Sequence, residues 1–353
     1  MDEADHPAPG CDAKDRRAAR IGDVARLAKV STATVSRALA TPDRVSPEAR
    51  ARVAAAIAAI GYMPNPAART LRSQKSRMVL VVLPDLANIF FSQILRGIEE
   101  TLFEAGYGMI IGNLDGPPEK EARIAALAAT GQVDGALLLN GHLFGQARGG
   151  RNLGSRTDAP VVALCEAIPA DIPQIEVDNR AAAAAMTRHL AELGHRRIAY
   201  VTGPEGNVLE RERFAGFREG LAAAGLAFDP SLVHPGDYSL EAGARIGAAL
   251  AERPDPTAVF SSNDAMAIGL MRALIERGVR VPGDVSVAGF DDIEYAAVAE
   301  PALTTIRQPR RDLGRTGAAI LLDLLAGRPA PARTRLDTEL VVRASTAPPP
   351  GAG

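Results

Sequence analysis

From Met78 onward the chain alternates short aliphatic runs with amphipathic segments, and this alternation constrains the fold more than any other feature. Short apolar runs bounded by turn residues are typical of buried parallel strands, and the segments between them have the spacing of helices. Repeated strand, helix, strand predicts a doubly wound parallel sheet. The runs that begin at residues 78 and 197 open similar series, which predicts two lobes. We expect strands at 78–84, 107–113, 135–140, 161–164, 197–203, 257–262 and 285–290, and helices at 92–103, 119–129, 180–193, 211–224, 240–251 and 265–277.

The segment from residue 20 to residue 72 follows a different pattern, that of short helices. Ile21, Val24, Ala25 and Ala28 share one helical face, and Ser31 is a candidate N-cap for a second helix at 32–39. Ser46 and Pro47 open a third helix that Gly61 ends. These helices predict one small core. A fourth helix, at 65–72, is too short to be stable in water by itself.

The charge is divided between these two parts of the chain. The whole chain has a net charge of −2, but residues 16–77 carry thirteen Arg and Lys against three Asp and Glu, a net charge of +10. The remaining residues therefore sum to −12. A basic helical segment indicates contact with a polyanion, because each phosphate that is neutralised releases counterions.

The run KVSTATVSRAL (29–39) is the first candidate site. Small residues fit a tight turn between two helices and leave Thr32, Ala33, Ser36 and Arg37 pointing outward. A helix with small polar residues and an arginine one turn later fits the major groove of DNA, where arginine reaches guanine. The alternative from this run alone is a helical hairpin with solvated charges, and the charge of the segment favours nucleic acid.

A set of segments along the chain resembles the lac repressor family of bacterial transcription regulators. The resemblance covers about residues 20–345. Within the family, KVSTATVSRAL, RGIE and TIRQPR are most similar to the repressors of nucleoside-utilisation genes. The segments are IGDVARLAKVSTATVSRAL (21–39), DRVSPEAR (43–50), IGYMPNPAARTLRS (60–73), VLPDLANIFFSQILRGIE (82–99), VDNR (177–180), GHRRIAYVTGP (194–204), RFAGF (213–217), PTAVFSSNDAMAIG (256–269), VPGDVSVAGFDDI (281–293) and PALTTIRQP (301–309).

The resemblance implies an all-α helix-turn-helix head and an α/β core like that of periplasmic binding proteins, with two doubly wound parallel-sheet lobes. We expect the head at 20–64, a hinge helix and linker at 65–77 and the core at 78–345, between loose tails at 1–19 and 346–353. The lobes would comprise about 78–176 with 307–331, and 177–306 with 332–345.

The resemblance also implies a homodimer that binds double-stranded operator DNA. Leu71 matches a leucine that enters the minor groove, and the alternative is packing against its dimer mate. Arg20 departs from the family pattern, because a Ser or Thr usually opens the first helix. The residues expected at the DNA are Thr32, Ala33 and Arg37 at base edges, Ser31, Thr34 and Ser36 at phosphates or in the turn, Tyr62 and Asn65 at the backbone, and Ala68, Arg69 and Leu71 in the hinge helix.

A small-molecule effector, a nucleoside or a sugar, is implied between the lobes. Phe90 and Phe91 would face a ligand ring, or belong to the core; Arg213 would clamp the ligand, or form a salt bridge within its lobe. Asp264 would bind the ligand or cap a helix. The complete set expected at the effector is Phe90, Phe91, Asn140, Glu166, Arg213, Tyr238, Asn263, Asp264 and Asp291.

Other classes of protein are not favoured by the sequence. The motifs GxxxxGK[ST], GxSxG and HExxH are absent, so we expect no enzyme and no cofactor. Cys11 and Cys165 are far apart and the five histidines are dispersed, so we expect neither a disulfide nor a metal site. The start of the chain lacks an apolar signal segment, so we expect a cytoplasmic protein with no membrane association, and not an exported sugar-binding protein. The sequence leaves open the effector's identity and whether it releases DNA or promotes DNA binding.

Overall fold

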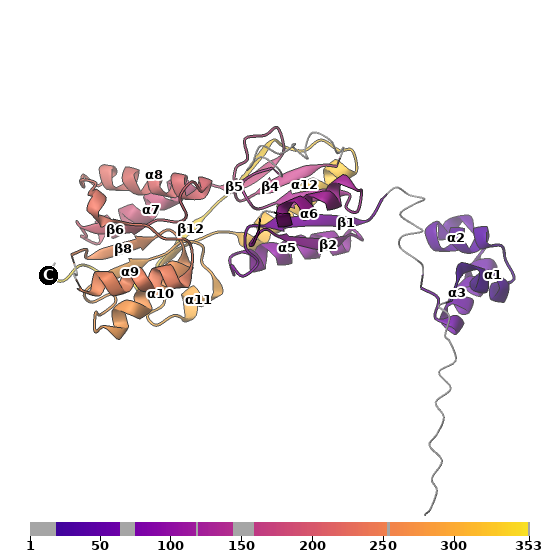
Figure 1. Cartoon of the computed structure of the whole chain (residues 1–353), viewed down its shortest axis with the longest axis horizontal. Helices are drawn as coiled ribbons and strands as arrows, with labels where there is room; N and C mark the ends of the chain where they lie inside the picture. The colour runs from indigo at the N-terminus through magenta and orange to yellow at the C-terminus, as the bar shows by residue number, and fades with distance from the viewer. Residues whose placement is uncertain (1–18, 64–74, 118, 144–158, 253–254, 352–353) are drawn as a thin grey trace, which may run out of the picture. The chain divides into compact units, whose positions relative to one another are not determined.

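The computed structural model describes residues 19–63, 75–117, 119–143, 159–252 and 255–351. It divides the chain into two compact units, residues 1–74 and residues 75–353, which we call the head and the core (Figure 1). The expected helix at 65–72 lies outside the described residues.

The head folds around a small apolar centre made by three helices. Its buried members include Val24 and Ala28 of the first helix, Val35 of the second and Val53 of the third. The expected caps are confirmed: Ser31 Oγ accepts the Thr34 amide at 3.1 Å, and Ser46 Oγ accepts the Ala49 amide at 3.3 Å. The elements are α1 (Ile21–Ala28), α2 (Thr32–Ala40), the 3₁₀ turn η1 (Pro42–Arg44) and α3 (Pro47–Ile60).

Helix α1 begins without a serine or threonine cap. The carboxylate of Asp23 accepts the backbone N–H of Arg20 at 3.0 Å. Asp23 also places a negative charge in the first turn, where the helix dipole favours it. The unusual Arg20 is therefore compatible with a well-formed start of the helix.

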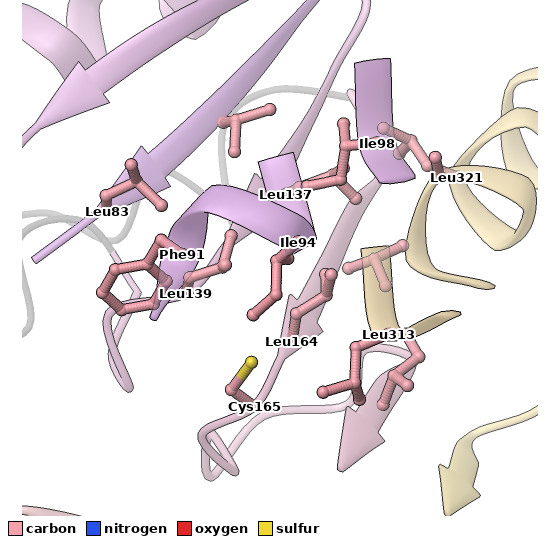
Figure 2. Close-up of a cluster of buried hydrophobic side chains, with 14 of the residues drawn as sticks. Leu83, Phe91, Ile94, Ile98, Leu137, Leu139, Leu164, Cys165, Leu313 and Leu321 are labelled. Atoms are coloured by element: carbon pink, nitrogen blue, oxygen red, sulfur yellow. The ribbon is translucent and has the colours of Figure 1, made fainter. Parts of the chain in front are cut away.

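The first lobe of the core is a six-stranded parallel sheet in the order β11-β5-β4-β3-β1-β2. Helices α5 and α12 cover one face, and Figure 2 shows Ile94, Ile98 and Leu321 of these helices near Leu137 and Leu164 of the strands. Helix α6 packs on the other face. The elements are β1 (Met78–Leu83), α5 (Phe91–Glu104), β2 (Gly108–Asn113), α6 (Glu119–Ala129), β3 (Gly135–Leu138), β4 (Val161–Leu164), β5 (Gln174–Val177), α12 (Arg310–Leu325) and β11 (Arg333–Leu336).

The second lobe is a four-stranded parallel sheet in the order β7-β6-β8-β9. Helices α7 and α8 cover one face, and α9 and α10 cover the other (Figure 1). An antiparallel pair, β10 and β12, stands beside this sheet. The elements are α7 (Asn179–Glu192), β6 (Ile198–Val201), α8 (Val208–Ala223), η3 (Pro230–Leu232), β7 (Val233–His234), α9 (Leu240–Glu252), β8 (Ala258–Ser261), α10 (Asp264–Glu276), β9 (Ser286–Ala288), α11 (Glu294–Val298), β10 (Thr305–Arg307) and β12 (Glu339–Val341).

Glycines bring the paired helices of both lobes into backbone contact. A Cβ on Gly97 of α5 would lie 2.1 Å from the Arg311 carbonyl oxygen of α12. A Cβ on Gly269 of α10 would lie 2.1 Å from the Leu240 carbonyl oxygen of α9. Interiors packed to crystal density do not yield to such an overlap without moving a helix. These glycines therefore fix the separation of the helix pairs.

The structure confirms the seven expected strands and six expected helices of the core, and adds elements that the sequence pattern did not indicate. Strand β5 (QIEV) and strand β11 (RTRL) are too polar to read as buried strands, and α12 opens with three charged residues and contains two glycines in its first half. Strands β7, β10 and β12 have only two or three residues each. These elements are recognised by their partners in space and not by their own pattern.

Three expected boundaries need correction. Strand β11 pairs with β5, so the first lobe extends to Leu336 and not to residue 331. Residues at the expected end of the linker belong to the core, because Asp134 accepts the amides of Ser76 and Arg77. The loose tail expected from residue 346 begins too early, because Ala347 is bound to the core. Ser286 Oγ donates to the Ala347 carbonyl oxygen at 3.0 Å and accepts the Ala347 amide at 3.0 Å.

Candidate functional site

A cavity of about 1010 Å³ lies between the two lobes of the core. It is formed by the loops that follow β1 and β4 in the first lobe and β6, β8 and β9 in the second, together with the starts of α8 and α9. The carboxyl ends of parallel strands are where ligands of such sheets bind. The position agrees with the sequence analysis, in which the resemblance implied a small-molecule effector between the lobes.

Arg213 is the central cation of the cavity and projects from α8. Arg213 is buried, with only 3% of its surface exposed. The guanidinium donates from Nε to Asn179 Oδ1 at 2.9 Å and from Nη1 to the Ser262 carbonyl oxygen at 2.6 Å. Its carbon Cζ lies 3.8 Å from the centre of the Phe290 ring. Four contacts thus hold the guanidinium in one orientation, including an ion pair with Asp291.

Asp291 follows β9 and is the buried partner of Arg213. Its Oδ1 lies 3.5 Å from Arg213 Nη2 and accepts from Gln308 Nε2 at 2.7 Å. The backbone has a φ of 121°, a region that side-chain-bearing residues rarely adopt. Burial raises the pKa of this carboxyl group to about 6, and the nearby Arg213 and the Gln308 hydrogen bond act in the opposite direction. The salt bridge expected for Arg213 within its lobe is confirmed, and Arg213 also lines the cavity, so its role as a ligand clamp stays a prediction.

Four aromatic residues line the cavity, namely Phe90, Phe91, Tyr238 and Tyr295. Phe90 and Phe91 stand edge to face with ring centres 5.2 Å apart, and both also belong to the buried core of the first lobe, in which Figure 2 shows Phe91. Tyr238 has a φ of 71° and lies against Gly203, where an added Cβ would be 2.3 Å from the tyrosine ring. Its buried hydroxyl has no hydrogen-bond partner among the described residues. This hydroxyl is therefore a polar group that a ligand or water would satisfy.

Glu166 and Asn207 join the two lobes across the cavity. Asn207 Nδ2 donates to Glu166 Oε1 at 3.3 Å, and Asn207 Oδ1 accepts the Glu210 amide and so caps α8. Burial raises the pKa of Glu166, which Asn207 and Arg213 counteract. A Cβ on Gly141 would lie 2.2 Å from Glu166 Oε2, so the glycine makes room for this carboxylate.

Two residues expected at the effector lie outside the cavity lining. Asn140 is buried and its amide donates to the His142 carbonyl oxygen. Asp264 is fully buried, with one carboxylate oxygen accepting from Thr305 and the other from the Ile293 amide, so the expectation of ligand contact is wrong in this structure. Its expected role as a helix cap is also wrong, because Asn263 caps α10 and Asp264 is the first residue of that helix. The expected residues that the structure does bring together are Phe90, Phe91, Glu166, Arg213, Tyr238, Asn263 and Asp291.

Several lining residues were missed by the sequence analysis. Asp85 and Asn88 follow β1, Asn207 follows β6, and Asp237 precedes Tyr238. The signal for Asn207 was available, because Asn207 with Glu210 has the spacing of a helix start. The others stand in irregular loops, and no periodic pattern marks a loop residue as facing inward.

The second candidate site is the beginning of helix α2 in the head. Ser31, Thr32, Ala33 and Arg37 are exposed there. Thr34 and Ser36 are half-buried, while Val35 packs into the apolar centre and fixes the orientation of the helix. An exposed helix start with hydroxyl groups and an arginine fits the major groove.

The remaining expected DNA contacts lie around the end of the head. Tyr62 is half-buried and packs against the apolar centre of the head. Asn65, Ala68, Arg69 and Leu71 lie outside the described residues, so their expected roles stay predictions.

The described residues contain neither a candidate membrane span nor a candidate metal site. No helix among them is long and apolar enough to cross a membrane. The part of the chain with described coordinates also contains no group of three or more His, Cys, Asp or Glu side chains placed to hold a metal ion.

Two family models match the chain. The model described as "Bacterial regulatory proteins, lacI family" matches residues 20–65, and the model described as "Periplasmic binding protein-like domain" matches residues 187–346. The first match covers the helices of the head. The second covers most of the second lobe and the returning segments α12, β11 and β12.

Individual proteins and solved structures are similar over nearly the whole chain. The HTH-type transcriptional repressor CytR of Escherichia coli K12 is 40% identical over 338 residues, which are 94% of this chain and 98% of CytR. The structure of the lac repressor dimer bound to operator and the anti-inducer ONPF is 30% identical and has a TM-score of 0.84. The match covers 94% of this chain and all of that chain. The structure of the transcriptional regulator CelR in complex with cellobiose is 33% identical and has a TM-score of 0.70. The match covers 93% of this chain and 99% of that chain. These likenesses confirm the resemblance found in the sequence: the chain belongs to the lacI family of bacterial regulatory proteins.

Proposed function

We propose that this protein is a sequence-specific DNA-binding transcription repressor that a small nucleoside or sugar controls. The observation that carries the proposal is the presence of two separate sites in one chain. The head exposes the start of a helix-turn-helix recognition helix, and the core encloses a cavity of about 1010 Å³ with aromatic and hydrogen-bonding side chains. A DNA site and a ligand cavity on separate units are what a ligand-controlled regulator requires.

The DNA contacts follow from the exposure and charge of the head. In the proposal, Thr32, Ala33 and Arg37 face base edges, because their side chains point outward from the start of α2. Ser31, Thr34 and Ser36 stand beside them at the turn, where hydroxyl groups contact phosphates. Tyr62 and the hinge residues Asn65, Ala68, Arg69 and Leu71 complete the proposed DNA-binding set.

The effector site follows from the cavity. Phe90, Phe91 and Tyr238 offer ring faces, while Arg213 and Asp291 offer fixed polar groups at the carboxyl ends of strands. Glu166 and Asn263 complete the polar lining. A ligand that contacts both lobes favours the lobe arrangement that it binds best, and in this way shifts the population of core conformations. A change in the core that alters how two heads are held in a dimer would then alter operator affinity.

Solved relatives support this division of roles. One lac repressor structure is a dimer bound to operator and to ONPF, and the CelR structure is a complex with cellobiose. A further family member from Enterococcus faecium has bound ribose, at 31% identity and a TM-score of 0.70. By analogy we infer a homodimer for this chain, acting in the cytoplasm on double-stranded DNA.

We assign the cavity to binding and not to a chemical reaction. Arg213 is committed to four partners, and burial raises the pKa of the Cys165 thiol, which keeps it protonated and unreactive. These groups suit a rigid binding surface.

Selection of genomic DNA fragments by the purified full-length protein tests the function. We expect enrichment of fragments that share a pseudo-palindromic sequence, since two heads of a dimer read two half-sites. Arg37→Ala serves as the matched variant and is expected to lose this enrichment while it still retains DNA without sequence preference. Retention without any preferred sequence by the unaltered protein would refute the proposal.

A further inference from the structure

The first residues of the core are bound by a carboxylate. Asp134, which precedes β3, accepts the Ser76 amide at 2.6 Å and the Ser76 hydroxyl at 2.8 Å, both through Oδ1. Its Oδ2 accepts the Arg77 amide at 3.0 Å. Hydrogen bonds to an ionised acceptor are stronger than neutral ones, so three of them fix the backbone of these two residues. We call Asp134, Ser76 and Arg77 the anchor.

Further contacts on both sides of Arg77 complete the anchor. The Arg77 carbonyl oxygen accepts the Gly108 amide of β2 at 2.8 Å, and the Met78 carbonyl oxygen accepts the Asp134 amide at 2.8 Å. The guanidinium carbon of Arg77 lies 5.0 Å from the centre of the Tyr107 ring. Arg77 has a φ of 57°, a left-handed conformation that is costly for a residue with a side chain. Such a conformation persists where the surrounding contacts impose it.

The anchor and the cavity lie at opposite ends of the same two strands. Strands β1 and β3 are hydrogen-bonded neighbours, and neither lies at an edge of the sheet. The anchor stands where both strands begin, whereas Pro84 after β1 and Leu139 after β3 line the cavity. The six residues of β1 span about 20 Å. A shift of the cavity wall therefore reaches the anchor through the centre of the first lobe.

We propose that the anchor transmits movement of the first lobe to the chain that leads to the head. The inference rests on the proposed function and names the point at which a ligand in the core acts on the DNA-binding unit. With the anchor intact, the chain leaves the core from a fixed point at Ser76. Without the anchor, Ser76 and Arg77 would add up to about 7 Å of slack, because an extended residue spans about 3.3–3.6 Å. Slack of this size lets the lobe move without moving the head.

Asp134→Ala removes the three side-chain hydrogen bonds of the anchor. The test measures the dissociation constant of the full-length protein for an enriched genomic fragment, with and without a saturating probe, by fluorescence anisotropy. The probe is whichever of the four common ribonucleosides, ribose and cellobiose binds most tightly by isothermal titration calorimetry. We expect the ratio of the two constants to be about 5–150 in the unaltered protein and below about 2 in the variant. The affinity for the probe in the absence of DNA should stay within about twofold, since the cavity lies at the other end of the strands.

Two further variants control for a general effect of the substitution. Asp229→Ala is the matched control, because the Asp229 carboxylate accepts the amide and the hydroxyl of Ser231 in the same way in the second lobe. Its ratio should equal that of the unaltered protein. Ser76→Ala is milder, since it removes the hydroxyl and leaves both amide donors, so its ratio should lie between those of the unaltered protein and Asp134→Ala. An undiminished ratio in Asp134→Ala would overturn the inference.

Hydrogen exchange tests the anchor without any probe. The amides of Ser76 and Arg77 both donate to Asp134, so they are protected as long as the carboxylate holds them. We expect mass spectrometry of overlapping peptic peptides to show that both amides exchange at least about tenfold faster in Asp134→Ala than in the unaltered protein. Equal rates would show that the carboxylate does not hold this segment, and would overturn the inference as well.

The outcomes separate this inference from the proposed function. A ratio near 1 in the unaltered protein, or a panel in which no probe binds, would count against the proposed function and leave the anchor nothing to transmit, so both would fall. A ratio of the expected size in the unaltered protein that persists in Asp134→Ala would leave the proposed function in place and overturn the inference alone.

Discussion

The buried pair of Arg213 and Asp291 allows a quantitative test of the structure. Arg213→Met removes the guanidinium and leaves the Asp291 carboxylate in a site that is 5% exposed. Breaking a buried ion pair from one side costs about 3–5 kcal/mol in unfolding free energy, because the remaining charge is left unpaired. The lost contact with Phe290 adds up to about 2 kcal/mol. Asp291→Asn should cost less, since Asn retains an oxygen that accepts from Gln308.

The double variant Arg213→Met with Asp291→Asn isolates the interaction. With both charges removed, no unpaired charge remains, so the combined cost should be smaller than the sum of the single costs by at least about 2 kcal/mol. Urea unfolding of the full-length protein followed by circular dichroism measures all four forms. Arg272→Met is the control, because Arg272 pairs with Glu276 at the surface and its loss should cost less than about 1 kcal/mol. Single costs that add to within about 0.5 kcal/mol would refute the coupling.

Three further predictions concern packing, pH and base recognition. Gly269→Ala should lower the unfolding free energy by about 1–3 kcal/mol, because its Cβ would overlap the Leu240 carbonyl oxygen. Gly22→Ala is the control, since its Cβ would meet no atom within 4 Å and should not destabilise the protein. Equal urea midpoints for the two variants would contradict the close contact between α9 and α10. Burial raises the pKa of Asp291 to about 6, so the stability that the protonated Asp291 side chain contributes is present in acid and is lost as the pH rises toward and through 6. Asp291→Asn should lack this part of the pH dependence of the unfolding free energy. Parallel curves of stability against pH for the two proteins would show that Asp291 does not titrate there. Arg37→Ala should weaken binding to an enriched genomic fragment by about 1–3 kcal/mol, and binding to random duplex much less, as fluorescence anisotropy would report; equal losses would remove its base-reading role.

The sequence predicted those elements whose pattern reflects their own burial. The strand MVLVVL is buried from Val79 to Leu83, and the caps at Ser31 and Ser46 form because a hydroxyl group before a helix satisfies its free amides. The same reasoning missed β5, β11 and α12. Strand β11 has alternating arginines and is ordered by pairing with β5, a contact 159 residues away between Arg335 and Glu176. No local pattern contains such a contact.

The candidate cavity was predicted in part. Loops after strands form much of the cavity, and the expected residues Asp291 and Tyr238 lie there, whereas Arg213 reaches the cavity from α8. Asp264 follows β8 in the same way, yet its carboxylate turns into the protein and accepts from Thr305 and Ile293. Whether a loop carboxylate faces inward depends on donors supplied by distant segments. For Asp264 those donors come from the loop after β9 and from β10, which the sequence pattern did not mark.

The central claim is that a ligand in the core changes the DNA affinity of the head. Its most direct test is the dissociation constant of the full-length protein for an enriched genomic fragment, measured by fluorescence anisotropy with and without a saturating nucleoside or sugar that calorimetry shows to bind the core. The account predicts a shift by a factor of about 5–150, the usual range for allosteric coupling, with no comparable shift for a random duplex. An unchanged dissociation constant in the presence of a ligand that calorimetry shows to be bound would contradict it.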